Sequence, residues 1–187
     1  MRKNYLLLIL IISVTSSFAQ QKRLSFEGTV QGGLLEGEMG SAFQTGAMVG
    51  IKKNTWTASI GGGLDYYKVR SIPLYLNLQK NVFDKSNTPF VYVSGGYHFL
   101  WLPEVFSVFS WPSTLQSKGG LYYQGGIGYQ VPAFKKTSLF FATAYSVKEY
   151  NETYLHANPC LIGPCPQREV KTNYRLRRLS ITTGLRF

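Results

Sequence analysis

The closing segment LSITTGLRF (179–187) alternates apolar and polar or small side chains and ends on an aromatic residue, Phe187. Successive side chains of an extended chain point to opposite faces, so Leu179, Ile181 and Leu185 share one face. The residues between them are polar, small or basic. The segment therefore predicts a β-strand with one apolar face.

The same period of two recurs along the chain, and helical periodicity is almost absent. The stretches that show it are 24–34, 43–51, 56–66, 72–79, 91–101, 121–131 and 139–148. With the closing segment they predict eight antiparallel strands, and an even number of strands places both ends of a barrel on one side.

Alternation alone does not say which face lies inside, because a lipocalin-like soluble barrel and an outer-membrane barrel have opposite faces inward. The interior of about eight strands is just wide enough for side chains to fill, so Trp, Tyr, Phe and Leu from every strand would overcrowd it. The opposite face, with Gly, Ser, Thr and Gln, fits inside an interior of this width. We therefore predict an all-β fold, an eight-stranded antiparallel up-and-down transmembrane β-barrel with its apolar face toward lipid.

Aromatic residues on the apolar face should gather at the two membrane interfaces. Those expected near the outer rim are Phe43, Tyr66, Phe99, Trp101, Tyr123 and Tyr145, and those near the periplasmic rim are Phe26, Trp56, Tyr129, Phe141 and Phe187. These residues predict two aromatic girdles around the barrel, one at each membrane interface.

Residues 1–19 have the features of a cleavable signal peptide. Basic residues precede the apolar run 6–12, and Ser17 and Ala19 stand at the third-last and last positions before the cleavage point. We expect residues 20–187 to form one barrel domain, integral to the outer membrane of a Gram-negative cell.

The charge of the mature chain is strongly positive. The whole chain has 20 Lys and Arg against 9 Asp and Glu, and removing Arg2 and Lys3 leaves 18 against 9, or +9. An exported protein meets the phosphates of lipopolysaccharide before any nucleic acid, so we expect outer-membrane lipid and lipopolysaccharide as partners and no nucleic acid.

These features resemble the small outer-membrane β-barrel family that includes OmpA- and OmpX-type barrels, and most closely the short "porin family" proteins of Bacteroidetes. The resemblance rests on the segments SFAQ (17–20), SIPLYL (71–76) and 179–187, and it covers nearly all of the mature chain. It implies that Phe187 is the assembly signal for the barrel-assembly machinery. Members serve as structural proteins, adhesins, receptors or enzymes, and Pro73 departs from regular strand chemistry, although the start of a strand tolerates a proline.

Charged residues on the inner face are the first candidates for function. They are Glu27 and Arg186 near the periplasmic end and Asp65, Lys148 and Arg178 near the outer end. One interpretation is a structural ion-pair network that plugs the lumen, and the other is a gated ion path.

A second group of cations is expected at the outer rim. Arg175 and Arg177 point outward just above the lipid-facing segment, with Lys68 and Arg70 as helpers. They are candidate contacts to lipopolysaccharide phosphates, and the alternative is an ordinary solvated loop base.

The two longest connections, 102–118 and 149–173, fall on the external side, where long loops are expected. The first carries an unusual apolar load that either folds back over the barrel mouth or binds a protein partner. The second contains Cys160 and Cys165, for which a local disulfide is the main interpretation. Metal binding together with His156 is the minor one, because a closed zinc site would still lack a ligand.

These observations predict a barrel with a structural or surface-binding role and with both long loops as interaction surfaces. The alternatives are a narrow porin-like channel and a subunit of a larger envelope complex held through the loop around Trp111. We expect no enzyme, because His98 has no serine or acid nearby in the sequence to complete a triad. We expect no cofactor and no metal.

Overall fold

The computed structural model describes residues 24–101, 116–157 and 167–187. The predicted signal peptide, the pair Cys160 and Cys165, and most of the connection 102–118 lie outside these residues. Within the described ranges, no helix is long and apolar enough to cross a membrane.

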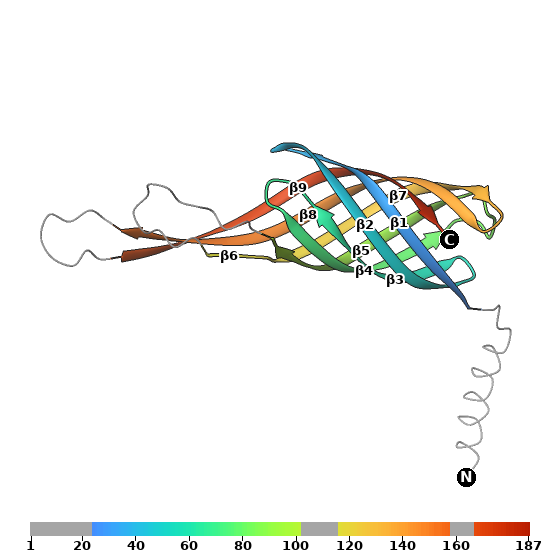
Figure 1. Cartoon of the computed structure of the whole chain (residues 1–187), viewed down its shortest axis with the longest axis horizontal. Coiled ribbons are helices and arrows are strands. Elements are labelled where there is room, and N and C mark those ends of the chain that lie inside the picture. The colour runs from blue at the N-terminus through green and yellow to red at the C-terminus, as the bar shows by residue number, and fades with distance from the viewer. Residues whose placement is uncertain (1–23, 102–115, 158–166) are drawn as a thin grey trace, which may run out of the picture.

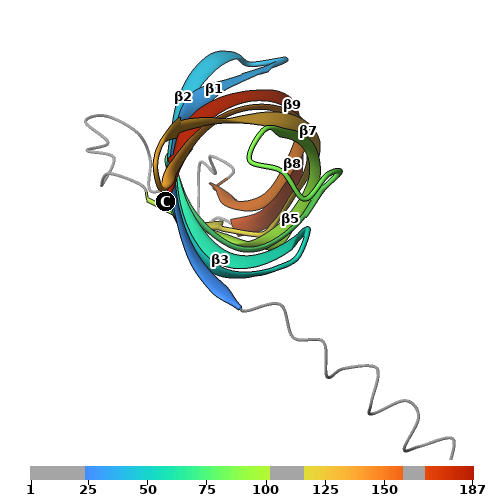
Figure 2. The same cartoon turned by 90° about the vertical axis from the view of Figure 1, so that its right-hand side faces the viewer.

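The described chain is built from antiparallel strands (Figure 1). They are β1 (Ser25–Gly37), β2 (Gly40–Lys53), β3 (Trp56–Asp65), β4 (Ser71–Asn81), β5 (Thr88–Leu100), β6 (Gln116–Lys118), β7 (Leu121–Phe134), β8 (Thr137–Ala157) and β9 (Gln167–Arg186). Neighbours in the sheet follow the order β6-β8-β7-β5-β4-β3-β2-β1-β9, and an additional pairing of β8 with β9 closes the ring seen end-on in Figure 2. With β6 outside the ring, the predicted eight-stranded antiparallel barrel is confirmed.

The closing segment completes the barrel wall. Ile181 lies opposite Leu34 of β1 on one side and opposite Thr143 of β8 on the other. The last residue, Phe187, exchanges two backbone hydrogen bonds with Gly28, at 2.7 and 2.9 Å. The β8–β9 hairpin projects from the opposite end of the barrel, and because long extensions lie on the outer side in this architecture, the end that holds Phe187 is assigned as the periplasmic end.

The apolar face points outward. On β4, for example, Leu76 is 67% exposed while the next residue, Asn77, is 6% exposed. Every aromatic residue predicted for the two girdles is exposed. A continuous apolar exterior of this kind is suited to lipid.

The interior differs from the predicted small polar filling, because several aromatic side chains are buried in it. Tyr75, Phe90, Tyr122 and Phe140 are each at most 6% exposed. Glycines on neighbouring strands leave the room that these rings occupy. A Cβ atom on Gly184 would lie 2.7 Å from Cε1 of Phe140, so a larger residue there would collide with the ring.

The outer end also differs from the prediction of a long loop over 149–173. Strands β8 and β9 remain paired as far as Ala157 and Gln167, and the resulting hairpin projects from the barrel (Figure 1). Strand β6, at the end of the predicted loop 102–118, pairs with β8 through Gln116 and Thr153. The alternation of apolar and polar residues ends at the membrane, but the backbone pairing does not, so the sequence pattern marks the membrane span and not the strand.

Candidate functional site: the lumen and the outer rim

The outer part of the lumen holds a cluster of buried charges centred on Asp65. Its Oδ2 atom lies 2.6 Å from Nη1 of Arg178 and 3.4 Å from Nζ of Lys148. The ammonium of Lys148 also donates to Oγ of Ser71 at 2.7 Å, and Nη2 of Arg178 donates to Oγ of Ser146 at 2.9 Å. Two cations thus share one carboxylate, and neutral oxygens of Ser71 and Ser146 accept further hydrogen bonds from them, while the buried Nε atom of Arg178 has no hydrogen-bond partner among the described residues.

An apolar layer covers this cluster on its outer side. It consists of Leu35, Tyr67, Tyr150 and Leu176, all buried. Tyr67 belongs to the turn between β3 and β4, and its backbone N–H donates to Oδ1 of Asp65 at 2.8 Å. The turn therefore folds back over the mouth of the barrel and separates the charges from water.

Tyr67 is held at both ends of its side chain. Its ring centre lies 5.3 Å from the guanidinium carbon of Arg178, and its hydroxyl accepts a hydrogen bond from the backbone N–H of Met39 at 2.8 Å. The next residue, Lys68, has a φ of 56°, a left-handed conformation that is uncommon outside glycine. Contacts to β9 and to the turn between β1 and β2 thus fix the turn that holds Tyr67.

The periplasmic part of the lumen holds a smaller cluster centred on Arg186. Its Nε atom lies 2.5 Å from Oε1 of Glu27. Its two terminal nitrogens donate to Oε1 of Gln130 at 2.6 Å and to Oε1 of Gln79 at 2.8 Å. One carboxylate therefore pairs with the guanidinium of Arg186, and two amide oxygens accept hydrogen bonds from it.

Between the two clusters the lumen is filled by side chains. The rings of Tyr75 and Tyr122 lie 5.7 Å apart across it. A cavity in this middle layer, lined in part by Gln124 and Arg186, measures about 10 Å³. That is about the space needed by one water molecule, so this cavity is too small to hold a column of water.

The structure separates the predicted rim cations into different environments. Arg175 forms an ion pair of 3.2 Å with Glu149 and a hydrogen bond with the hydroxyl of Tyr123. Arg177 is exposed on the outward face of β9.

The other two predicted rim cations lie over aromatic rings. The ammonium of Lys68 is 4.2 Å from the ring centre of Tyr174, and the guanidinium carbon of Arg70 is 5.8 Å from that of Tyr66. The four residues therefore do not form one cluster, and Arg177 is the one whose exposed position best suits contact with a phosphate.

Two buried contacts were not predicted from the sequence. Nε2 of His98, which is fully buried, lies 2.7 Å from the backbone oxygen of Glu149, and Lys148 contacts Ser71. The alternation of side chains puts Lys148, and by the same parity His98, on the inner face. Their partners depend on the register between strands, which alternation does not give.

Within the described residues, no group of three or more His, Cys, Asp or Glu side chains could hold a metal ion. The candidate chemistry of this part of the molecule is therefore ion pairing and hydrogen bonding inside the wall, and binding at its outer end.

Comparison with known proteins defines the class through the fold. No family model and no curated protein matches the chain. The crystal structure of the outer membrane protein OprG from Pseudomonas aeruginosa is similar, with a TM-score of 0.59 and 11% identity over 89% of this chain and 97% of that one. The solid-state NMR structure of the outer membrane protein AlkL in DMPC bilayers has a TM-score of 0.48 and 13% identity over 88% of this chain and 87% of that one.

The likeness to OprG establishes the fold. Together with the apolar exterior, it makes this chain an integral outer-membrane β-barrel.

Proposed function

We propose that the protein is a non-conducting outer-membrane barrel with a structural or surface-binding role. The observation that carries the proposal is the packing of the lumen. Buried ion pairs lie at both ends, and aromatic rings with a cavity of about 10 Å³ lie between them. A barrel filled in this way is a rigid anchor, which leaves its surfaces to perform the function.

The outer end is the surface that we assign to binding. The β8–β9 hairpin extends beyond the barrel wall, and β6 widens it on one edge. At its base the rings of Tyr150 and Tyr174 stack with centres 4.9 Å apart, and the ammonium of Lys68 lies over both. These contacts make the hairpin a stiff projection suited to a protein partner.

Lipopolysaccharide is the proposed lipid partner at this end. Arg177 is exposed two residues beyond the exposed, apolar Leu179, and Arg175 is exposed on the same outward face of β9. A guanidinium there is suited to charge-assisted hydrogen bonds with a lipid phosphate. Lys68 and Arg70 contribute to the positive potential of the rim.

Three more specific properties of this barrel are predictions from the sequence. They are the similarity to OmpA- and OmpX-type barrels and to the Bacteroidetes porin family, recognition of Phe187 by the barrel-assembly machinery, and membership of a larger envelope complex. The proposal includes no catalytic step and no cofactor.

Conductance in planar bilayers tests the proposal against a narrow porin-like channel. The refolded wild-type protein, checked by its heat-modifiable gel mobility, should give no single-channel steps even at high protein load. Steps in the wild type whose ion selectivity changes in Arg178→Gln would overturn the proposal and establish a channel.

A further inference from the structure

Three residues at the periplasmic end form a row on the outward face of the barrel. Lys53 of β2 is the register partner of Trp56 of β3, and Trp56 is in turn the register partner of Lys80 of β4. The ammonium of Lys80 lies 5.0 Å from the centre of the Trp56 ring. One exposed indole is therefore flanked by lysines on both neighbouring strands.

An apolar depression of about 250 Å³ begins beside this row. It is lined by Trp56, Leu78, Lys80, Val91 and Val93, together with Tyr92. Leu78, Val91 and Val93 are all exposed on the outward face, so the depression opens toward lipid. An apolar depression thus lies directly beside Lys80, and Lys53 lies on the other side of Trp56.

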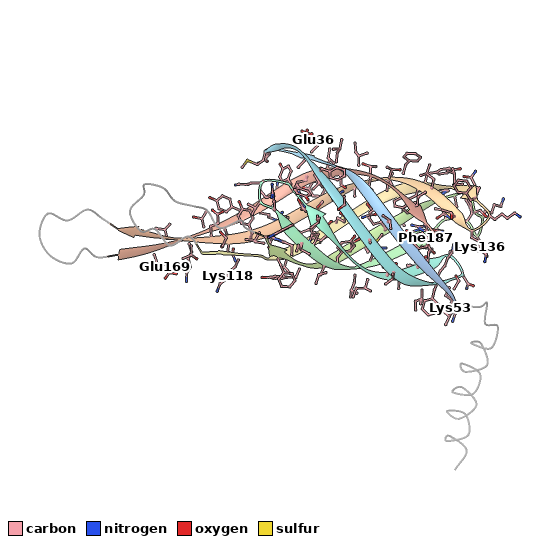
Figure 3. The ribbon with its side chains drawn as sticks, in the orientation of Figure 1. Glu36, Lys53, Lys118, Lys136, Glu169 and Phe187 are labelled. Carbon is pink, nitrogen blue, oxygen red and sulfur yellow. The ribbon has the colours of Figure 1, made fainter. Side chains whose placement is uncertain are left out.

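The row lies at the membrane interface. Lys53 and Trp56 flank the tight turn at Asn54, which has a φ of 56°. Figure 3 shows Lys53 at the same end of the barrel as Lys136 and Phe187. Aromatic side chains of a membrane protein prefer this height, where the headgroups of the inner leaflet lie.

We infer that Lys53, Trp56 and Lys80 bind one anionic phospholipid of the inner leaflet. The two ammonium groups bind the phosphodiester, the indole packs against the glycerol region, and one acyl chain occupies the depression formed by Leu78, Val91 and Val93. The inference depends on the membrane-spanning fold and not on the proposed role of the outer end.

The charges favour an anionic headgroup over a zwitterionic one. A phosphatidylethanolamine headgroup carries its own ammonium, which Lys53 and Lys80 repel, whereas phosphatidylglycerol presents only negative charge. Other lysines at this end, Lys52 and Lys85, add to the attraction, and Asp84 in the β4–β5 turn reduces it.

The position of the depression favours a lipid over a soluble polyanion. Cell-wall fragments are negatively charged too, but they lie in water and have no hydrocarbon chain to fill the depression. Such a fragment would bind through the lysines alone, and a side chain that fills the depression would not change its binding.

Native mass spectrometry of the full-length protein in detergent tests the inference. Phosphatidylglycerol and phosphatidylethanolamine with identical acyl chains are added in equal amounts. The wild type should retain one phosphatidylglycerol in preference to phosphatidylethanolamine. The double variant Lys53→Ala with Lys80→Ala should lower this retention roughly tenfold.

Two further variants separate the site from general charge. Lys135→Ala with Lys136→Ala removes the same charge from the β7–β8 turn and should retain the lipid as the wild type does. Val91→Trp fills the depression without changing the charge and should lower retention. Heat-modifiable mobility shows that each variant is folded.

Three results would overturn the inference. They are equal retention of the two lipids, equal loss in the control double variant, and displacement of phosphatidylglycerol by a soluble peptidoglycan fragment with no effect of Val91→Trp. Failure here would leave the conductance result unchanged, so it is distinguishable from failure of the proposed function.

Discussion

The two ends of the lumen differ in how their buried charges are paired. In the outer cluster two cations share Asp65, and the side chains of Arg178 and Asp65 are 0% and 4% exposed. In the periplasmic cluster one cation meets one carboxylate, and the side chains of Arg186 and Glu27 are 8% and 10% exposed. The outer cluster also has an apolar cover that includes Tyr67.

The difference concerns how much each cluster depends on its carboxylate. A buried ion pair adds little net stability, but loss of one partner leaves an uncompensated charge in a low dielectric. Removal of Asp65 would leave two such charges, whereas removal of Glu27 would leave one that still has two amide acceptors. The outer cluster should therefore be the more sensitive.

The largest effect is expected for Asp65→Asn. The substitution keeps the shape of the side chain but leaves Lys148 and Arg178 buried without an anion, which should lower the free energy of unfolding by about 3–5 kcal/mol. Urea unfolding in lipid vesicles measures the loss. Combining it with Lys148→Met should recover part of the stability, and a loss below about 1 kcal/mol would show that the cluster is hydrated.

A smaller effect is expected for Arg178→Met. The substitution removes one cation but leaves Lys148 and Asp65 balanced, with Nζ already 3.4 Å from Oδ2. The loss should be about 2 kcal/mol, chiefly from hydrogen bonds to Asp65 and Ser146. The same unfolding measurement applies. A loss equal to that of Asp65→Asn would mean that hydrogen bonding, and not charge balance, sets the sensitivity of this cluster.

The periplasmic cluster should tolerate Glu27→Gln better. Arg186 keeps its hydrogen bonds to Gln79 and Gln130 and lies nearer to water, so the loss should be about 1 kcal/mol. The matched comparison is Asp65→Asn, which makes the same chemical change at the other end. Equal losses in the two variants would contradict the contrast between the ends.

The sequence predicts the faces of the strands well, but not which residues meet. The apolar and polar parity that places Leu76 outside and Asn77 inside is local, since it depends only on the alternation of side chains. The contact between Arg178 and Asp65 joins residues that are 113 positions apart in the sequence. It depends on barrel closure and on the registers of all intervening strands, which no local pattern specifies.

Two other features, the buried aromatic rings and the projecting hairpin, could not be predicted from the alternation of apolar and polar residues. The interior accepts Phe140 only because Gly184 faces it, and such volume complementarity is a property of a pair. In the projecting hairpin the adjacent register pairs Asn151–Asn173 and Glu152–Thr172 place polar residues on both faces. A strand without an apolar face has no period of two to detect.

The smallest effect is expected for Tyr67→Phe, which tests what the cover contributes to the outer cluster. The ring keeps its packing and its position over Arg178, so the cation–π contact persists. Only the hydrogen bond from Met39 is lost, and because Met39 is 56% exposed, water can replace the acceptor. The free energy of unfolding should fall by about 0.5 kcal/mol. The variant should show no conductance in planar bilayers, since the layers below the cover are unchanged.

Tyr67→Ala is the matched variant that removes the ring, and it should lower the free energy of unfolding several times more than Tyr67→Phe does. If the two variants were equally destabilised, the hydroxyl would hold the turn in place, and the cover would depend on one hydrogen bond instead of on its apolar packing.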